Sequence, residues 1–148
     1  MTEVSLTRVL TFSAAHRYYR PEWSQQRNVD TFGPCANEHG HGHTYHCHVT
    51  VAGPLDDDTA MVVNLGEFDR VLKEEVFERF DHRHMNFEVA EFAFGRQIPT
   101  SEALAVFVWR RIARRLPSGV RLERVRVQED PFLYAEYDGR SEADGEAS

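Results

Sequence analysis

The stretch HGHGHTYHCHVTVAG, residues 39–53, decides the fold of this chain. From residue 42 onward its apolar side chains fall on every second position, which is the period of a half-buried β-strand. Gly53 and Pro54 follow as a turn signal that closes the strand. The alternating apolar positions are Tyr45, Cys47, Val49 and Val51. The stretch therefore predicts a strand over residues 42–53 whose odd-numbered side chains face the core.

A second alternating strand is predicted over residues 3–16, because its even-numbered positions are mostly apolar. Two amphipathic helices follow this pair of strands. The first begins near Asn64, a good N-cap residue, with Glu67 as its capping-box partner. The second opens at PTSE, residues 99–102, and stops at a Pro-Ser-Gly turn, residues 117–119.

Two further strands complete the order of elements, one through Val125 and Val127 and the other over residues 132–137. The chain thus contains two strands, two helices and two strands in succession. Two long connections remain, residues 17–41 and 81–99. Loops of this length in a compact domain usually carry function or disorder, so both are candidates for the functional site.

The composition suits one globular domain, since the 148 residues are 41% hydrophobic and 28% charged. We assign residues 1–138 to this domain and residues 139–148, which are small, polar and acidic, to a flexible tail. The chain has 17 basic and 24 acidic residues, and the net charge of −7 argues against nucleic-acid and membrane-surface binding. Two cysteines cannot form a disulfide framework, so we expect a cytoplasmic protein.

Histidine is the compositional outlier, with eight residues in the chain and five of them in one stretch of ten. If the two alternating strands pair antiparallel, His16 leaves the core face of the first strand beside His41 and His43 at the start of the second. Three imidazoles without a fourth protein ligand are typical of a catalytic zinc site. The alternative is an adventitious metal-binding tract or a solvated turn. The histidines of opposite parity, to which we assign no ligand role, are His46 and His48.

Two groups in the long connections are candidates for proton transfer. Cys35 lies six residues before His41, and a thiol near a divalent metal is expected to have a lowered pKa, so that its thiolate can act as base or nucleophile. Asp81 and His82 directly follow the first helix and can form an acid–base dyad. The alternatives are an ordinary free cysteine and a charge cluster at the end of a helix.

Glu129 shares the parity of Val125 and Val127, which places a carboxylate on the apolar face at the end of a strand. Such a group is costly unless it is paired or bound to a ligand, and two N–H donors of a guanidine-like heterocycle would satisfy it. The alternative is that the strand has already ended and Glu129 is a solvated turn residue. For Thr100, Ser101 and Glu102 simple helix capping is the stronger interpretation from the residues alone.

Five motifs, in order along most of the chain, resemble the 6-pyruvoyltetrahydropterin synthase / 6-carboxytetrahydropterin synthase family. They are FSAAH (12–16), Cys35 with HGHTY (41–45), FDH (80–82), PTSE (99–102) and VQE (127–129). The set of five in this order is far more specific than any one of them.

The resemblance implies a zinc-dependent lyase that acts on 7,8-dihydroneopterin triphosphate and eliminates triphosphate. It implies Cys35 as the catalytic base, the Asp81–His82 pair as a proton relay and Glu129 as the anchor of the pterin ring. The residues to which the resemblance assigns roles are His16, His41 and His43 for Zn²⁺, Cys35, Asp81 and His82 for catalysis, and Glu129, Thr100, Ser101 and Glu102 for substrate binding.

The implied architecture is the tunnel fold, an α+β fold with a four-stranded antiparallel sheet and two helices on one face in the order ββααββ. Subunits of the family join edge to edge into a trimeric barrel, and two trimers stack into a homohexamer. Sites lie between subunits, so Cys35 and the Asp81–His82 pair can come from different chains. The implied partners are the pterin triphosphate and further copies of the chain, with no nucleic acid and no membrane.

Two products stay open, because HGHGH allows either His39/His41 or His41/His43 as the metal pair. The spacing from Cys35 to His41 resembles 6-pyruvoyl synthases, whereas the spacing to His39 resembles the 6-carboxy enzymes of queuosine biosynthesis, which release acetaldehyde. We choose the second pair, because Thr44-Tyr45 follows it as the family pattern requires. A hypothesis of another class is a non-catalytic protein that stores zinc or nickel on its histidine-rich strand.

Overall fold

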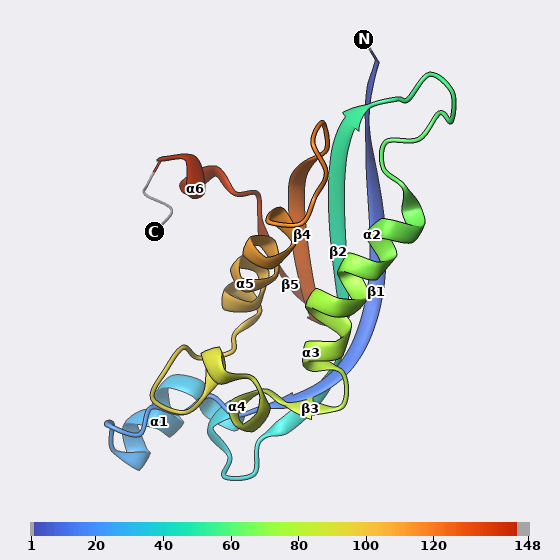
Figure 1. The fold of residues 1–148 in the computed structure, drawn as a ribbon. Helices are drawn as coiled ribbons and strands as arrows, with labels where there is room; N and C mark the ends of the chain where they lie inside the picture. The colour runs from blue at the N-terminus through green and yellow to red at the C-terminus, as the bar shows by residue number, and fades with distance from the viewer. Residues whose placement is uncertain (1, 145–148) are drawn as a thin grey trace.

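The computed structural model describes residues 2–144, and its centre is a curved sheet with helices on one face (Figure 1). The sheet has the strand order β3-β1-β2-β4-β5. Four of its strands pair antiparallel, which confirms the predicted α+β fold. These four are β1 (Glu3–His16), β2 (His41–Pro54), β4 (Arg121–Asp130) and β5 (Leu133–Tyr137). The two-residue strand β3 (Arg83–His84) was not expected and pairs parallel with the end of β1.

Two helical segments cover one face of this sheet (Figure 1). The first is continuous and contains one π-helical turn, which interrupts the regular helix. Both segments begin where the capping signals predict: the Asn64 side chain accepts from the Glu67 N–H (3.0 Å), and the Thr100 side chain accepts from the Ala103 N–H (3.1 Å). The elements are α2 (Leu65–Leu72), the π-turn η2 (Lys73–Phe77), α3 (Glu78–Phe80) and α5 (Ser101–Ala113).

The core lies between the helices and the face of the sheet that the alternation indicates, with Phe12, Tyr45 and Val127 all buried. Alternation does not bury the whole of β1, because Val4 and Leu6 are 40% and 38% exposed. The reason is coverage: in Figure 1 the start of β1 extends beyond the helices. The buried side chains of β1 therefore lie in its last part, at Phe12, Ala14 and His16.

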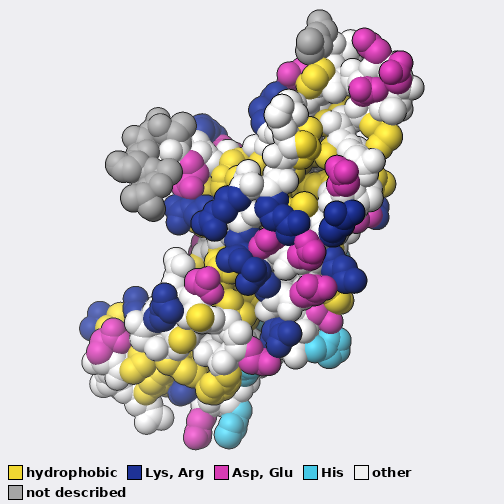
Figure 2. All heavy atoms as spheres, in the orientation of Figure 1, with side chains coloured by type: hydrophobic (Ala, Val, Ile, Leu, Met, Phe, Trp, Pro, Cys, Tyr) yellow, Lys and Arg dark blue, Asp and Glu magenta, His cyan; other side chains and the backbone are white. Residues whose placement is uncertain are grey.

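The outer face of the helices carries interleaved cationic and anionic side chains (Figure 2). Glu75 on η2 accepts from Arg111 Nε (2.9 Å) and from Arg115 (3.1 Å) on or beside α5. These bonds tie the two helical segments to each other. Arg111 and Arg115 thus have partners in the fold, and we give the arginines of this face no functional role.

The two long connections contain short helices that the sequence did not indicate. These are α1 (Gln25–Phe32), the 3-10 turns η1 (Gly33–Ala36) and η3 (Ala90–Phe92), and α4 (Met85–Glu88). Two buried asparagines fix the connections: Asn28 accepts from the Arg20 N–H (2.7 Å), and Asn86 accepts from the Arg17 N–H (2.6 Å). The segments escape a pattern search because each is too short to show a helical period, although buried amides and core side chains such as Met85 and Phe92 hold them.

The region predicted as a flexible acidic tail, 139–148, begins with the short helix α6 (Arg140–Asp144). Glu142 in this helix accepts from Arg110 Nε of α5 (2.9 Å) and from the Tyr137 hydroxyl (2.8 Å). The first residues of the predicted tail are therefore attached to the domain, whereas 145–148 lie outside the described residues. Within residues 2–144, no helix combines the length and apolar character that a membrane span requires.

Candidate metal centre and its surroundings

Three histidines meet where β1 ends and β2 begins. His16 is directly opposite His41 in the strand register, and His43 lies opposite Ala14 on the same face. One ring nitrogen of each histidine lies within 4.8 Å of one ring nitrogen of each of the other two. The ring centroids are 4.9–5.1 Å apart. The antiparallel pairing of β1 and β2 thus brings residues from both ends of a 24-residue connection into one cluster.

The chemistry of this cluster fits a metal ion. His16 Nε2 and His43 Nε2 are buried and have no hydrogen-bond partner among the described residues. Burial, followed by the neighbouring His43 and His41, lowers the pKa of His16 to about 3, so its ring is neutral at neutral pH. Burial also lowers the pKa of His41. Neutral imidazoles with free lone pairs are the ligands that a divalent transition metal prefers, and the three can hold one.

The structure separates His39 from this cluster. Gly40 has a φ of +70°, and a Cβ at that position would collide with the carbonyl of His16, so glycine is required there. His39 precedes this turn, lies outside β2 and is exposed. Of the two possible pairs in HGHGH, the fold brings His41 and His43 to His16.

Cys35, in η1, lies beside the cluster, with its Sγ 3.8 Å from His41 Nε2. Its carbonyl accepts from the Tyr18 N–H (2.8 Å), which holds this turn against the end of β1. Burial, followed by the charge of Glu129, raises the pKa of the Cys35 thiol. This is opposite to the lowering that the sequence suggested, because that lowering depends on a cation beside the sulfur.

Glu129 reaches the same cluster from the end of β4. It is 8% exposed, its Oε1 accepts from the Ser101 hydroxyl (2.8 Å), and its Oε2 lies 3.7 Å from His43 Nε2. The solvated-turn interpretation of Glu129 is therefore wrong. A buried carboxylate with one hydroxyl donor and an oxygen facing a histidine still has acceptor capacity for a ligand.

The three residues at the start of α5 divide between two tasks. Thr100 caps the helix, Ser101 is buried and donates to Glu129, and Glu102 is exposed in the first turn. Capping alone thus accounts for Thr100, whereas Ser101 connects the helix to the cluster.

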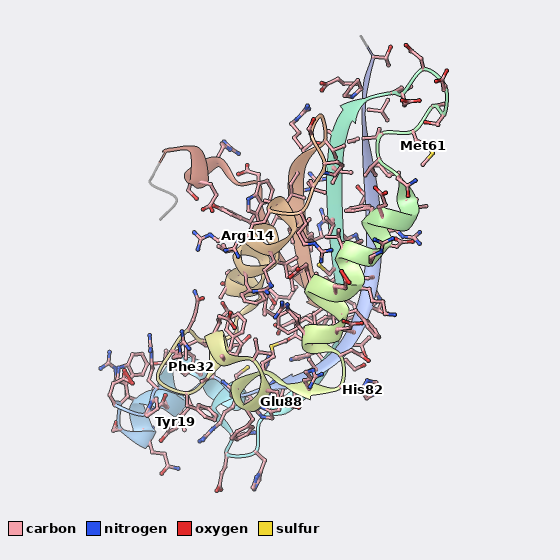
Figure 3. All side chains as sticks on the ribbon, viewed as in Figure 1. Tyr19, Phe32, Met61, His82, Glu88 and Arg114 are labelled. Atoms are coloured by element: carbon pink, nitrogen blue, oxygen red, sulfur yellow. The ribbon has the colours of Figure 1, made fainter. Side chains whose placement is uncertain are left out.

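Asp81 and His82 form the expected dyad, with His82 Nδ1 2.7 Å from Asp81 Oδ2. The pair is bound to the outer edge of β1, where the Ser13 N–H donates to Asp81 Oδ1 (3.0 Å) and the His82 N–H donates to the Ser13 carbonyl (2.6 Å). The Ser13 N–H and then His82 lower the pKa of Asp81. The His82 side chain is 83% exposed and projects from the margin of the molecule (Figure 3). Asp81 and His82 thus form the dyad, but the His82 side chain points outward from the chain into solvent.

Two tyrosines complete the surroundings and were not singled out from the sequence. The buried Tyr45 hydroxyl lies 2.8 Å from His16 Nδ1. Tyr18 lies with its ring centroid 4.5 Å from that of His16, and burial and the Glu129 carboxylate raise the pKa of its phenol. A signal existed for Tyr45, because a buried phenol usually has a hydrogen-bond partner. None existed for Tyr18, which lies in a connection without periodicity.

Comparison with known proteins gives consistent matches. The family model described as 6-pyruvoyl tetrahydropterin synthase matches residues 5–140. A 6-pyruvoyl tetrahydrobiopterin synthase of Drosophila melanogaster is 39% identical over 90% of this chain and 79% of its own length. The Homo sapiens enzyme of the same name is 36% identical over 93% of this chain and 92% of its own length. A solved structure of Caenorhabditis elegans 6-pyruvoyl tetrahydropterin synthase superposes with a TM-score of 0.86 at 33% identity, covering 94% of this chain and 97% of that one.

Proposed function

Because the chain belongs to the 6-pyruvoyl tetrahydropterin synthase family, we propose that it is a zinc-dependent lyase that converts 7,8-dihydroneopterin triphosphate to 6-pyruvoyltetrahydropterin and triphosphate. The observation that carries this proposal is the cluster at the end of β1. Three imidazoles, a thiol and a buried carboxylate with spare acceptor capacity meet there.

We assign the metal to His16, His41 and His43. The support is the pair of buried ring nitrogens without partners and, among residues 2–144, a group of three ligand residues without a fourth, which leaves a position for substrate. A bound zinc ion supplies Lewis acidity to the side-chain oxygens of the substrate and so acidifies the neighbouring C–H.

The pterin ring is assigned to Glu129. An ionised carboxylate accepts two parallel N–H groups of a guanidine-like heterocycle, and this geometry fixes the orientation of the ring. The Ser101 hydroxyl holds one oxygen of that carboxylate at 2.8 Å, so Ser101 acts on the ring through Glu129. Thr100 and Glu102, on the same turn of α5, are assigned as further substrate contacts.

Proton transfer is assigned to Cys35 and to the Asp81–His82 dyad. The Cys35 thiolate removes the proton from the side-chain carbon of the substrate. Its Sγ lies 3.8 Å from His41 Nε2, so a metal ion held by the triad would supply positive charge that favours the thiolate. Asp81 orients His82 and stabilises its protonated form, which lets the ring carry a proton to or from the opposite side of the substrate.

The exposure of this dyad supports an assembly in which a neighbouring copy completes the site. His82 lies on the outer edge of β1, while Cys35 lies inside the cluster. Strand β5 is the other edge of the sheet, and pairing between such edges removes unpaired backbone groups. We assign the protein to a homohexamer built from two trimeric barrels. Both cysteines are free thiols, which suits a reducing compartment, and we place the protein in the cytoplasm.

The direct test is turnover of 7,8-dihydroneopterin triphosphate by the zinc-loaded protein. We expect triphosphate release, a product with the mass of 6-pyruvoyltetrahydropterin and no acetaldehyde. Cys35→Ala is expected to lower kcat by about 10²- to 10⁴-fold with the zinc content unchanged, because it removes the base and not a metal ligand. Cys47→Ala is the matched control, since Cys47 is buried in β2 and its side chain points into the core.

Each other outcome has a definite meaning. Acetaldehyde release would identify a 6-carboxy synthase instead. Unchanged turnover in Cys35→Ala would remove the thiol from the mechanism. One tightly held zinc without turnover would exclude the lyase, and several loosely held zinc or nickel ions would indicate a storage protein.

A further inference from the structure

The most buried contact of the histidine cluster is the one between Tyr45 and His16. Tyr45 and His16 are both fully buried, and the phenol oxygen lies 2.8 Å from His16 Nδ1. The Tyr45 ring stacks on Phe12 with centroids 5.0 Å apart and an interplanar angle of 16°. The packing therefore fixes the hydroxyl beside Nδ1 of His16.

Protonation of the His16 ring decides which nitrogen can bind a metal. A neutral imidazole carries one N–H and one lone pair, and only the nitrogen with the lone pair can be a ligand. Nδ1 is occupied by Tyr45, whereas Nε2 is buried and has no partner among the described residues. A ligand lone pair on Nε2 requires the proton on Nδ1, and the Tyr45 oxygen must then accept that N–H.

A phenol is an unusual partner for this purpose. Metal-bound histidines commonly donate to a carboxylate, a backbone carbonyl or water. A phenol hydroxyl can both donate and accept a hydrogen bond, and it is ordinarily uncharged at neutral pH. A neutral acceptor orients the ring without adding negative charge, which would preserve the Lewis acidity of a metal held by the three imidazoles.

The other two imidazoles lack an equivalent support. His41 Nε2 lies 3.8 Å from the Cys35 sulfur, and His43 Nε2 lies 3.7 Å from Glu129 Oε2, so both nitrogens face groups of the cluster itself. The shortest side-chain hydrogen bond that the three histidines make within the described residues is the one from His16 to Tyr45. The hydrogen bond to Tyr45 therefore fixes the orientation of the His16 ring before a metal binds.

We infer that Tyr45 is a positioning residue of the metal centre: its hydroxyl accepts the Nδ1–H of His16 and thereby directs Nε2 to the metal. This inference rests on the proposed function, because it assumes that the three histidines hold the ion. It adds that removal of the Tyr45 hydroxyl weakens metal binding, although all three histidine ligands remain.

The first test needs no variant. The zinc-loaded protein, with ¹⁵N-labelled histidine, is studied by long-range ¹H–¹⁵N correlation NMR, which distinguishes a protonated ring nitrogen from a metal-bound one. We expect His16 to show a proton on Nδ1 and zinc on Nε2, with its resonances identified by their loss in His16→Ala. Zinc on Nδ1 of His16 would overturn the inference.

The second test measures zinc affinity by competition with a chromophoric chelator. Tyr45→Phe keeps the stacked ring and removes the oxygen, and we expect the Kd for zinc to rise about 10- to 100-fold. Tyr137→Phe is the matched control, since its hydroxyl bonds to Ser141 (2.6 Å) and Glu142 (2.8 Å), away from the cluster. Urea unfolding of both metal-free variants shows whether each is folded in the assay. If Tyr45→Phe is unfolded there, the NMR result alone decides.

The outcomes separate the two proposals. If the parent protein binds no zinc, or if His16→Ala binds it equally well, the proposed metal site is wrong. If the parent binds one zinc, His16→Ala loses it and a folded Tyr45→Phe binds it as tightly as Tyr137→Phe does, the metal site stands and the inference about Tyr45 is wrong.

Discussion

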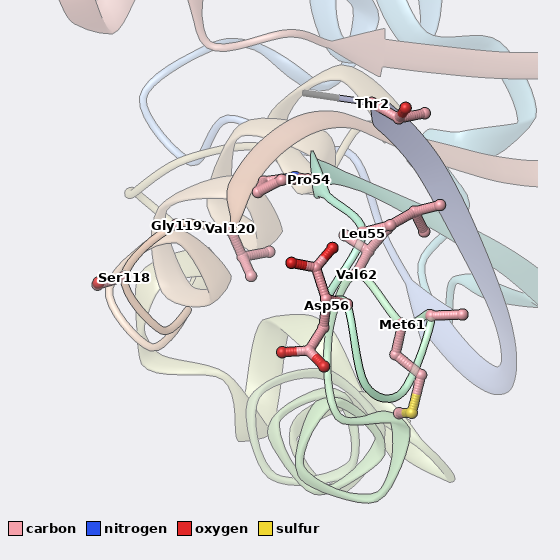
Figure 4. Close-up of a pocket in the computed structure, with 11 residues that line it drawn as sticks. Thr2, Pro54, Leu55, Asp56, Met61, Val62, Ser118, Gly119 and Val120 are labelled. Carbon is pink, nitrogen blue, oxygen red and sulfur yellow. The ribbon is translucent and has the colours of Figure 1, made fainter.

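The two ends of the sheet differ in how their polar side chains are satisfied. Where β1 ends and β2 begins, His16 and His43 each hold a buried ring nitrogen without a partner among the described residues. At the opposite end an open depression of about 820 Å³ lies between the segment after β2 and the turn before β4, and Asp56 borders it (Figure 4). The Asp56 carboxylate accepts from the N–H groups of Asp58 (3.0 Å) and Thr59 (2.9 Å) within its own loop.

The two ends differ in their unsatisfied polar groups. The depression has open volume, but its carboxylate is used by a local turn and is open to solvent. At the histidine end, each buried polar atom without a partner carries a desolvation cost that a ligand would remove. Three predictions test this contrast, from the largest expected effect to the smallest.

The largest effect is expected at Glu129. Glu129→Gln keeps the size of the side chain but replaces one acceptor oxygen with a donor, which opposes the N–H groups of the pterin. We expect kcat/KM to fall by roughly 30- to 1,000-fold, or about 2–4 kcal/mol, mainly through KM, with zinc content unchanged. Ser101→Ala removes only the hydroxyl that holds Oε1 and should cost less than Glu129→Gln. Equal steady-state kinetics of Glu129→Gln and the parent would remove Glu129 from substrate binding.

The stability of the metal-free protein should depend on pH differently at the two ends of the sheet, because His16 and Asp56 bind protons in different pH ranges. The pKa of His16 is about 3 in the fold, because of burial first and of His43 and His41 next, against 6.5 in the unfolded chain. The unfolded state therefore binds the extra proton below pH 6.5, so the contribution of His16 to stability is complete above pH 6.5 and is lost as pH falls toward 3. Backbone N–H groups lower the pKa of Asp56 below 3.8, so its contribution is lost only below that pH.

Urea unfolding between pH 7 and 4.5 measures this difference. We expect the free energy of unfolding of the parent to decrease as the pH is lowered. His16 accounts for at most about 1.4 kcal/mol of this decrease per pH unit. His16→Gln should flatten the slope, whereas Asp56→Asn should leave it unchanged in this range. The same slope in His16→Gln and in the parent would show that His16 is not held neutral by the fold.

The smallest effect is expected at the depression itself. Asp56→Ala removes the acceptor of the turn but touches no group of the histidine cluster. We expect a slightly lower Tm, unchanged zinc stoichiometry and a kcat/KM within about twofold of the parent, as for a surface substitution away from a functional site. A large loss of activity in Asp56→Ala would mean that the acidic end contributes to function and that the contrast drawn here is wrong.

Local patterns predicted the parts of this molecule that depend on local geometry. Alternation places residues on one face of a strand because side chains alternate with a period of two, and it therefore grouped His16, His41 and His43. Caps at Asn64 and Thr100 predicted the starts of the helices, because a side chain three residues before an amide can accept from it. The caps act over only three residues of the chain, and the grouping of the histidines requires only the pairing of two strands.

Only the tertiary structure decided which distant groups touch. Ser101 and Glu129 are 28 residues apart and Tyr45 and His16 are 29 apart, and no local period connects them. The direction of the Cys35 pKa depends on burial and on Glu129, and the exposure of His82 depends on the edge of β1 to which it is bound. By itself the sequence determined which faces the strands present, since that follows from backbone geometry. Contacts and electrostatics at the site came from the packing of segments far apart in the chain.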